Sequence, residues 1–194
     1  MIGVSRRAAL LGATRRLALS KGLPATTVDE ICDVAGVTKG SFYYYFASKD
    51  EIGLASLDEY FADLTGALTG GDWGQHASAR DRLTAFLAHA AEVSVGPALQ
   101  HGCLMGSFAI DLAERQRPVQ EALATMFSAM RDLVASLIAD AAAESGRDVD
   151  AAALADQFLA TVEGAVVLAK GHRDPTLPGR ILNSYADCMH ALLG

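Results

Sequence analysis

The stretch from Thr26 to Asp50 restricts the possible folds more than any other part of this sequence, because signals for short helices follow one another closely there. Thr27 and Glu30 have the Thr-x-x-Glu spacing of a capping box, which predicts a helix that begins after Thr27. Gly36 predicts that this helix ends soon afterwards, since glycine readily adopts the left-handed conformation found at helix ends. The helix is therefore expected to be short and sharply terminated.

A second short helix is predicted directly after the turn, beginning at Thr38, which is a favourable N-cap residue. Phe42 and Phe46 are four residues apart, so they share one face of that helix and predict its buried edge. An amphipathic helix over residues 5–21 comes before both. Two short helices joined by a Gly-containing turn, with a supporting helix before them, predict a helix-turn-helix unit.

The rest of the chain also has the periodicity of helices, without the alternation typical of strands. Ser48 and Glu51 form another capping-box pattern, which predicts a long helix over 49–68 before a loop at 69–74. Further helices are expected over residues 77–95, 101–115, 117–144, 150–171 and 177–193. The sequence therefore predicts an all-α protein.

The charge is divided unevenly along the chain. The formal net charge is −7, which taken alone argues against a nucleic-acid-binding protein. Residues 1–50, however, hold seven Lys and Arg against four Asp and Glu, whereas the other 144 residues hold nine against nineteen. The two parts are therefore expected to face different partners.

The sequence gives no sign of export, membrane insertion or metal binding. Arginines interrupt the apolar stretches near the N-terminus, and no later apolar run approaches the roughly 18 residues of a membrane span, so we expect a soluble cytoplasmic protein without a membrane partner. Cys32, Cys103 and Cys188 lie far apart and are expected to be reduced thiols. The five histidines lack ligand spacing, so neither a metal nor a cofactor is predicted.

Residues 26–50 resemble the signature of TetR/AcrR-type transcriptional regulators, with the sequence TTVDEICDVAGVTKGSFYYYFASKD. The shared features are a Gly-Val turn, a short recognition helix ending in an aromatic cluster and a Ser-Lys step, and the resemblance covers residues 5–60. It implies a dimer with nine or ten helices per chain, most simply a repressor. The resemblance assigns residues 1–48 to a DNA-binding domain and residues 49–194 to a ligand-sensing and dimerisation domain.

The residues themselves support this interpretation, because a recognition helix must expose small polar and basic groups opposite its anchored face. Gly40 would let the helix approach the DNA backbone closely, and Lys39 can reach a guanine edge or a phosphate. Tyrosine hydroxyls and the positive N-terminal end of the preceding helix can bind phosphates. The candidate DNA-binding residues are Thr27, Thr38, Lys39, Gly40, Ser41, Tyr43, Tyr44, Tyr45 and Lys49, although Tyr45 is equally consistent with packing in the core.

Dimerisation is expected because one reading helix in a segment of net charge +3 offers too few phosphate contacts for strong operator binding. In the family, the last two helices form a four-helix bundle with those of a second copy. The predicted interface residues here are Phe158, Val162, Val166, Ile181, Tyr185 and Met189. The same residues are consistent with an ordinary internal core, and the sequence leaves both interpretations open.

Two interpretations of the sensing half also stay open. Cys103, near the start of a predicted helix, resembles the reactive cysteine of the electrophile-responsive, NemR-like branch of the family, and Lys170 is a candidate partner of that thiol. The alternative is an apolar ligand in a pocket lined by Phe86, Met105, Phe108, Met126, Phe127 and Met130. Cys103 is also consistent with a small buried core residue.

Other classes of function fit less well. A thiol-dependent enzyme using Cys103 and His101 would lack an accompanying nucleophile elbow, phosphate loop or cofactor fingerprint, so no enzyme is predicted. An architectural DNA-binding protein is disfavoured by the acidity of the last 144 residues. The expected partners are double-stranded operator DNA, a second copy of the chain, and an unidentified small-molecule inducer or electrophile. Helix 49–68 is the expected lever between reader and sensor.

Overall fold

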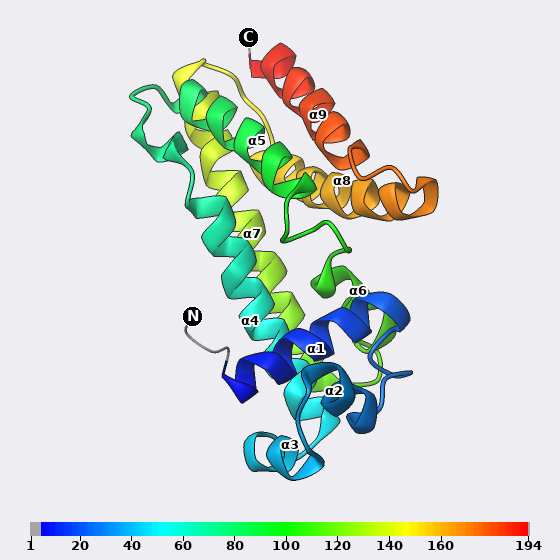
Figure 1. The fold of residues 1–194 in the computed structure, drawn as a ribbon. Helices are drawn as coiled ribbons and strands as arrows, with labels where there is room; N and C mark the ends of the chain where they lie inside the picture. The colour runs from blue at the N-terminus through cyan, green and yellow to red at the C-terminus, as the bar shows by residue number, and fades with distance from the viewer. Residues whose placement is uncertain (1–4, 194) are drawn as a thin grey trace. The chain divides into compact units, whose positions relative to one another are not determined.

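The computed structural model describes residues 5–193, and over this range the chain forms nine α-helices and one 3-10 helix without any β-strand (Figure 1). The predicted all-α class is confirmed. The helices divide into two compact units, each built from two separate stretches of chain. The first unit runs up to Asp63 and includes Cys103–Leu123, and the second comprises Leu64–Gly102 and the chain from Ala124 onward.

The first unit contains the predicted helix-turn-helix. Its helices are α1 (Arg6–Lys21), α2 (Val28–Ala35), α3 (Lys39–Tyr45), most of α4 (Lys49–Thr69), α6 (Leu104–Asp111) and the beginning of α7 (Arg117–Glu144). Helix α1 packs against α2, α3 and α6, and α2 packs against α3. The buried side chains between them are Leu10, Leu11, Ala13, Ile31, Cys32, Phe42, Phe46 and Ile52.

The predicted starts and stops of the short helices are confirmed. The Thr27 side chain accepts a hydrogen bond from the Glu30 backbone N–H while the Glu30 side chain accepts one from the Thr27 N–H, which is a complete capping box. Gly36 ends α2 with φ of 67°, in the left-handed region that glycine adopts without strain. Thr38 caps α3 by accepting a hydrogen bond from the backbone N–H of Ser41.

The second unit holds the remaining helices. They are the end of α4, the 3-10 helix η1 (Asp72–Gln75), α5 (Ala79–Val95), the rest of α7, α8 (Ala151–His172) and α9 (Leu177–Leu193). Helix α9 packs against both α5 and α8. A chain of aromatic rings runs through this unit, with centroid separations of 5.4 Å from Trp73 to Phe86, 6.1 Å from Phe86 to Phe158, and 5.5 Å from Phe158 to Tyr185.

The structure differs from the prediction most in α6, which covers Leu104–Asp111 instead of 101–115. Gly102 has φ of 119°, outside the helical region, and Cys103 is an extended N-cap residue, so the helix cannot begin earlier. Leu112 leaves the helical conformation at the other end. Helix α6 is therefore a short element between two irregular segments.

Helices α7 and α8 have a property that the sequence analysis did not expect. Each contains an 18-residue window that is long and apolar enough to cross a membrane by length and composition alone. Only 33% of that window in α7 and 22% in α8 is buried within the single chain. Among the described residues, the large apolar side chains left exposed on these two helices are Val167 and Leu168, both in α8.

Candidate DNA-binding surface

Two phenylalanines anchor the short helix α3 to the first unit. Phe42 is fully buried and Phe46 is 3% exposed, and their ring centroids lie 6.1 Å apart. The guanidinium group of Arg7 lies over the Phe46 ring at 5.5 Å from the centroid, within range of a cation–π contact. This anchoring fixes which face of α3 is available to a partner.

The opposite face of α3 is open to solvent. Tyr43 is 58% exposed and Tyr44 80%, and 61% of the Lys39 side chain is exposed. Thr38 and Gly40 are also exposed, whereas Ser41 is half-buried. Tyr45 is half-buried and packs against the core of this unit, with its ring 6.5 Å from that of Phe46. Tyr45 therefore has a packing role of its own.

The ammonium group of Lys39 has an intrachain partner, the carboxylate of Asp29 in α2, at 2.6 Å. Both side chains are about 60% exposed, so water screens the pair and it adds little to stability. A nucleic-acid phosphate can therefore replace Asp29 as the partner of Lys39 at small cost. Sequence analysis missed Asp29, whose only signal was its position in the first turn of α2.

The fold of the chain does not require glycine at position 40. It lies in the first turn of α3, and an added Cβ would meet only the Thr38 hydroxyl oxygen, at an ordinary 3.8 Å. The fold would accept alanine there. Absence of a side chain at an exposed position of the candidate reading helix is therefore consistent with close approach of a partner.

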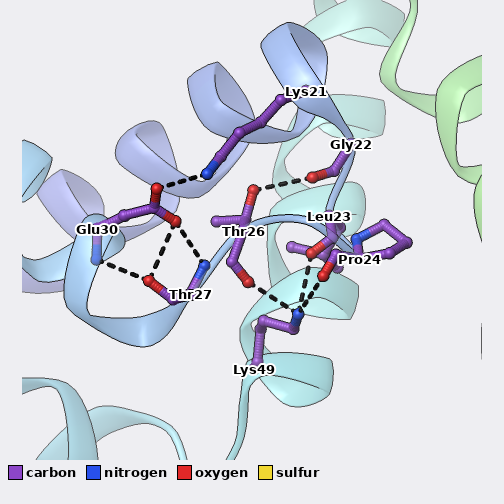
Figure 2. Close-up of polar contacts among 8 residues, drawn as sticks. All are labelled: Lys21, Gly22, Leu23, Pro24, Thr26, Thr27, Glu30 and Lys49. Atoms are coloured by element: carbon purple, nitrogen blue, oxygen red, sulfur yellow. Dashed lines mark hydrogen bonds and ion pairs between the residues drawn. The ribbon is translucent and has the colours of Figure 1, made fainter.

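The donors of Thr27 are occupied inside the chain, as Figure 2 shows. Its backbone N–H donates to a Glu30 carboxylate oxygen at 2.9 Å, and its hydroxyl donates to the same oxygen at 3.0 Å. The Lys21 ammonium and these bonds from Thr27 together lower the pKa of Glu30 from 4.5 to about 2. A phosphate contact by Thr27 would require this network to open.

Lys49 also has a different environment from the one the sequence suggested. Its ammonium donates hydrogen bonds to three backbone oxygens of the turn between α1 and α2 (Figure 2). The acceptors are the carbonyl oxygens of Leu23, Pro24 and Thr26, at 3.0, 3.2 and 2.8 Å. All three donors of the ammonium are then occupied within the chain, so the predicted phosphate contact of Lys49 stays a prediction and would require these bonds to open.

Comparison with known proteins identifies the family. Residues 10–55 match the family model described as "Bacterial regulatory proteins, tetR family", and residues 79–185 match "Tetracyclin repressor-like, C-terminal domain". The chain belongs to the TetR family. It is a DNA-binding transcriptional regulator with an N-terminal helix-turn-helix and a C-terminal helical domain, as the sequence predicted.

This chain is similar to other transcriptional regulators in sequence and in structure. The transcriptional regulator AcuR of Cereibacter sphaeroides is 35% identical over 156 residues, which are 77% of this chain and 69% of AcuR. The repressor NemR of Escherichia coli is 29% identical over 140 residues, 72% of this chain and 67% of NemR. A TetR transcriptional regulator from Chloroflexus aurantiacus has a crystal structure that aligns with a TM-score of 0.82 at 25% identity, covering 94% of this chain and 92% of that one.

The predicted sensor residues of this TetR-family chain fall in different units, Cys103 in the first and Lys170 in the second. Cys103 is the N-cap of α6 and is 8% exposed, whereas Lys170 is exposed. Burial raises the pKa of the Cys32 thiol, with a contribution from Asp33, which disfavours the reactive thiolate. No disulfide joins the three cysteines of the described residues.

The six predicted pocket residues also divide between the units. Met105 and Phe108 are buried in the first unit, where the Phe108 ring lies close to Gly53 of α4. Phe86, Met126 and Met130 are buried in the second unit, and Phe127 is half-buried there. The second unit does have a groove of about 380 Å³, but it is lined by Ser78, Arg80, Asp81, Leu83, Thr84, His190 and Leu193. A pocket formed by the predicted residues stays a prediction.

Four of the six predicted dimer residues have partners within the chain instead. Phe158, Val166, Tyr185 and Met189 are at most 7% exposed, and the Tyr185 hydroxyl donates to the Leu154 carbonyl oxygen at 2.8 Å. Burial raises the pKa of Tyr185 to about 12, with a smaller contribution from Cys188. Val162 and Ile181 are half-buried. The large apolar side chains that α8 and α9 leave exposed are Val167, Leu168 and Leu192, at 63%, 47% and 42%.

Within residues 5–193, no group of three or more His, Cys, Asp or Glu side chains is placed to hold a metal ion.

Proposed function

We propose that a homodimer of this chain represses transcription by reading a near-palindromic operator in the cytoplasm with its two α3 helices. The observation that carries the proposal is the two-sided character of α3. Phe42 and Phe46 fix its inner side, while Lys39, Tyr43 and Tyr44 are exposed on the outer side. Such a helix can enter the major groove without losing its anchor.

The dimer face that we propose lies on the exposed side of α8, with a contribution from α9. Val167 and Leu168 are exposed there, and Gly164 and Gly171 have open space around their missing Cβ positions. Small residues beside exposed aliphatic ones let a second helix approach closely and cover the apolar surface. This face replaces the buried residues that the sequence suggested, and it accounts for the uncovered apolar character of α8.

DNase footprinting of the upstream DNA of the gene tests the DNA-reading proposal. We expect one short protected palindrome, and Lys39→Ala should weaken protection while Arg147→Ala, which removes an exposed arginine from the turn after α7, should not. Protection spread evenly along the DNA would point instead to an architectural protein. Equal effects of both substitutions would contradict a reading role for α3.

We also propose that modification of Cys103 releases the operator. Its side chain is buried at the N-terminus of α6, a helix that packs against α1 of the reader within the same unit. Adding even a small group to a buried thiol requires α6 to move, because packed interiors have no spare volume. The relative NemR, at 29% identity, is named a transcriptional repressor, which supports the repressing function that this release would reverse.

Treatment with N-ethylmaleimide tests this sensor. The reagent should release operator DNA from the wild-type protein. It should do the same with Cys188→Ser, a control that lacks the exposed thiol of Cys188. Cys103→Ser should keep its DNA after the same treatment. Release that persists in Cys103→Ser would exclude the thiol sensor and favour an effector that binds without covalent chemistry.

A further inference from the structure

The three-carbonyl contact of Lys49 joins parts of the chain that are far apart in sequence. The acceptors on Leu23, Pro24 and Thr26 precede Lys49 by 26, 25 and 23 residues. The chain between the turn and Lys49 contains all of α2 and α3. One ammonium group therefore closes the base of the loop that carries the helix-turn-helix (Figure 2).

The turn that Lys49 binds is itself held firmly. Leu23 is 1% exposed and packs so closely on α4 that a Cβ added at Gly53 would lie 2.6 Å from its Cδ2 atom. The Thr26 hydroxyl donates to the Gly22 carbonyl oxygen at 2.9 Å, and Gly22 has φ of 83°. Because Thr26 lies two residues before the first residue of α2, a contact that fixes this turn also fixes the beginning of α2.

We propose that Lys49 is a positioning residue for operator binding, which holds α2 and α3 in place by tying the α1–α2 turn to the first residue of α4. The proposal rests on the proposed DNA-reading function of α3. It differs from a phosphate contact in its chemistry, because an ammonium with three carbonyl acceptors has no N–H left for DNA. The positive charge of Lys49 is then needed inside the chain.

Two substitutions distinguish the effect of the positive charge of Lys49 from that of the arrangement of its three N–H donors. Lys49→Met keeps an unbranched stem and removes the charge and all three donors. Lys49→Arg keeps the charge, but a planar guanidinium cannot direct three hydrogens toward three carbonyls that converge on one point. Arginine serves well as a phosphate ligand, so a phosphate role predicts that Lys49→Arg binds DNA normally. The matched control is Lys39→Met, which removes an exposed ammonium from α3.

The first measurement is hydrogen exchange of backbone amides without DNA, so it does not depend on the proposed function. Loss of a charge-assisted network should speed exchange of the amides over 26–35 by about tenfold or more in both Lys49 variants. Amides of α5 and α9 should be unchanged, as should all amides in Lys39→Met. Uniformly faster exchange in both units would mean a general loss of stability and would overturn the proposal, as would unchanged exchange over 26–35.

The second measurement is affinity for a duplex selected by the wild-type protein from a randomised pool, at several salt concentrations. Both Lys49 variants should bind this duplex about tenfold or more weakly than the wild type, with an unchanged dependence of affinity on salt. For Lys39→Met, the slope of log affinity against log salt concentration should fall in magnitude by about 0.9 for each phosphate contact removed. A reduced slope in Lys49→Met with normal binding by Lys49→Arg would establish a phosphate contact and overturn the positioning role. If the wild-type protein selects no sequence, the DNA-reading function fails, and the exchange data still decide whether Lys49 holds the turn. If Lys49→Met does not fold, Lys49→Arg carries both measurements.

Discussion

Replacing Gly40 by alanine should raise the stability of the protein while weakening its grip on DNA. An added methyl group at this exposed position meets only the Thr38 hydroxyl oxygen, at 3.8 Å, so nothing in the chain has to move. Alanine is a better helix former than glycine by about 1 kcal/mol in a helix interior, and about half of that is expected in the first turn of α3. For a chain of 194 residues this raises Tm by about 1–2 °C.

The effect on DNA binding has the opposite sign. If α3 lies in the major groove with its first turn against the sugar-phosphate backbone, the methyl group occupies space that the DNA needs. Forcing one extra carbon into a close-packed contact costs about 1–3 kcal/mol, and a dimer carries two copies of the substitution. A total of about 2 kcal/mol or more corresponds to a loss of about thirtyfold or more in affinity.

Thermal unfolding and fluorescence anisotropy with a labelled operator duplex measure the two effects separately. Gly66→Ala is the control, because Gly66 lies in α4, is exposed and has open space around it, so only stability should change. Operator affinity in Gly40→Ala equal to that of Gly66→Ala would show that the α3 backbone does not approach DNA at this point. A fall in Tm would show that the fold itself requires glycine at position 40.

Three further predictions concern charge, pH and assembly. Asp29→Asn should raise operator affinity at low salt by up to about fivefold, measured by anisotropy, because it frees Lys39 from an exposed ion pair of about 0–1 kcal/mol; unchanged affinity would mean that Lys39 does not reach DNA. Glu30, whose pKa is lowered from 4.5 to about 2, stabilises the folded state above pH 4.5 and loses that effect as the pH falls toward 2. The difference in urea midpoint between wild type and Glu30→Gln should therefore be largest near neutral pH and shrink below pH 4.5, and a constant difference would contradict the network. Val167→Glu should convert the dimer to monomers in analytical ultracentrifugation, whereas Ile110→Glu, at an 83% exposed position of α6, should not.

The boundaries of the short helices could be predicted because their signals are local. A capping box involves two residues three positions apart, and a left-handed C-cap depends on one glycine, so Thr27, Glu30 and Gly36 carry their own information. The second capping pattern is present in one half. The Ser48 hydroxyl accepts from the backbone N–H of Glu51 at 3.1 Å as predicted, but the Glu51 carboxylate accepts from the N–H of Ala47 at 2.6 Å, one residue before the expected partner Ser48.

The partners of Lys49 could not be predicted in this way. Its three acceptors are backbone carbonyls, which every residue has, and they lie in a turn more than twenty positions earlier. From the sequence alone, a lysine at the start of a helix next to a DNA-reading segment suggests a phosphate contact. Only the fold brings the first residue of α4 to the α1–α2 turn, where these acceptors lie.

The dimer face that we propose differs from the predicted one because α8 is apolar on more than one side. A hydrophobic pattern shows that a helix has apolar residues, but it does not show which of two apolar faces meets the chain's own core. Phe158 and Val166 face inward, and Val167 and Leu168 stay exposed. Large aromatic side chains favour the inner face, since burying them inside one chain contributes the most to its stability.

The division into units changes how a signal can reach the reader. Helix α4, the expected lever, belongs to both units, with Lys49–Asp63 in the first and Leu64–Thr69 in the second. Helix α6 lies wholly in the first unit and packs against α1. At its C-terminal end, the Asp111 carboxylate lies so close to Gly22 that an added Cβ there would be 2.7 Å away. A shift of α6 would therefore act on the α1–α2 turn, which also accepts the hydrogen bonds of Lys49 from α4.

Helices α4 and α6 thus both contact the turn that precedes α2. We therefore expect an effector that moves either helix to change the placement of α3 and hence the fit to the operator.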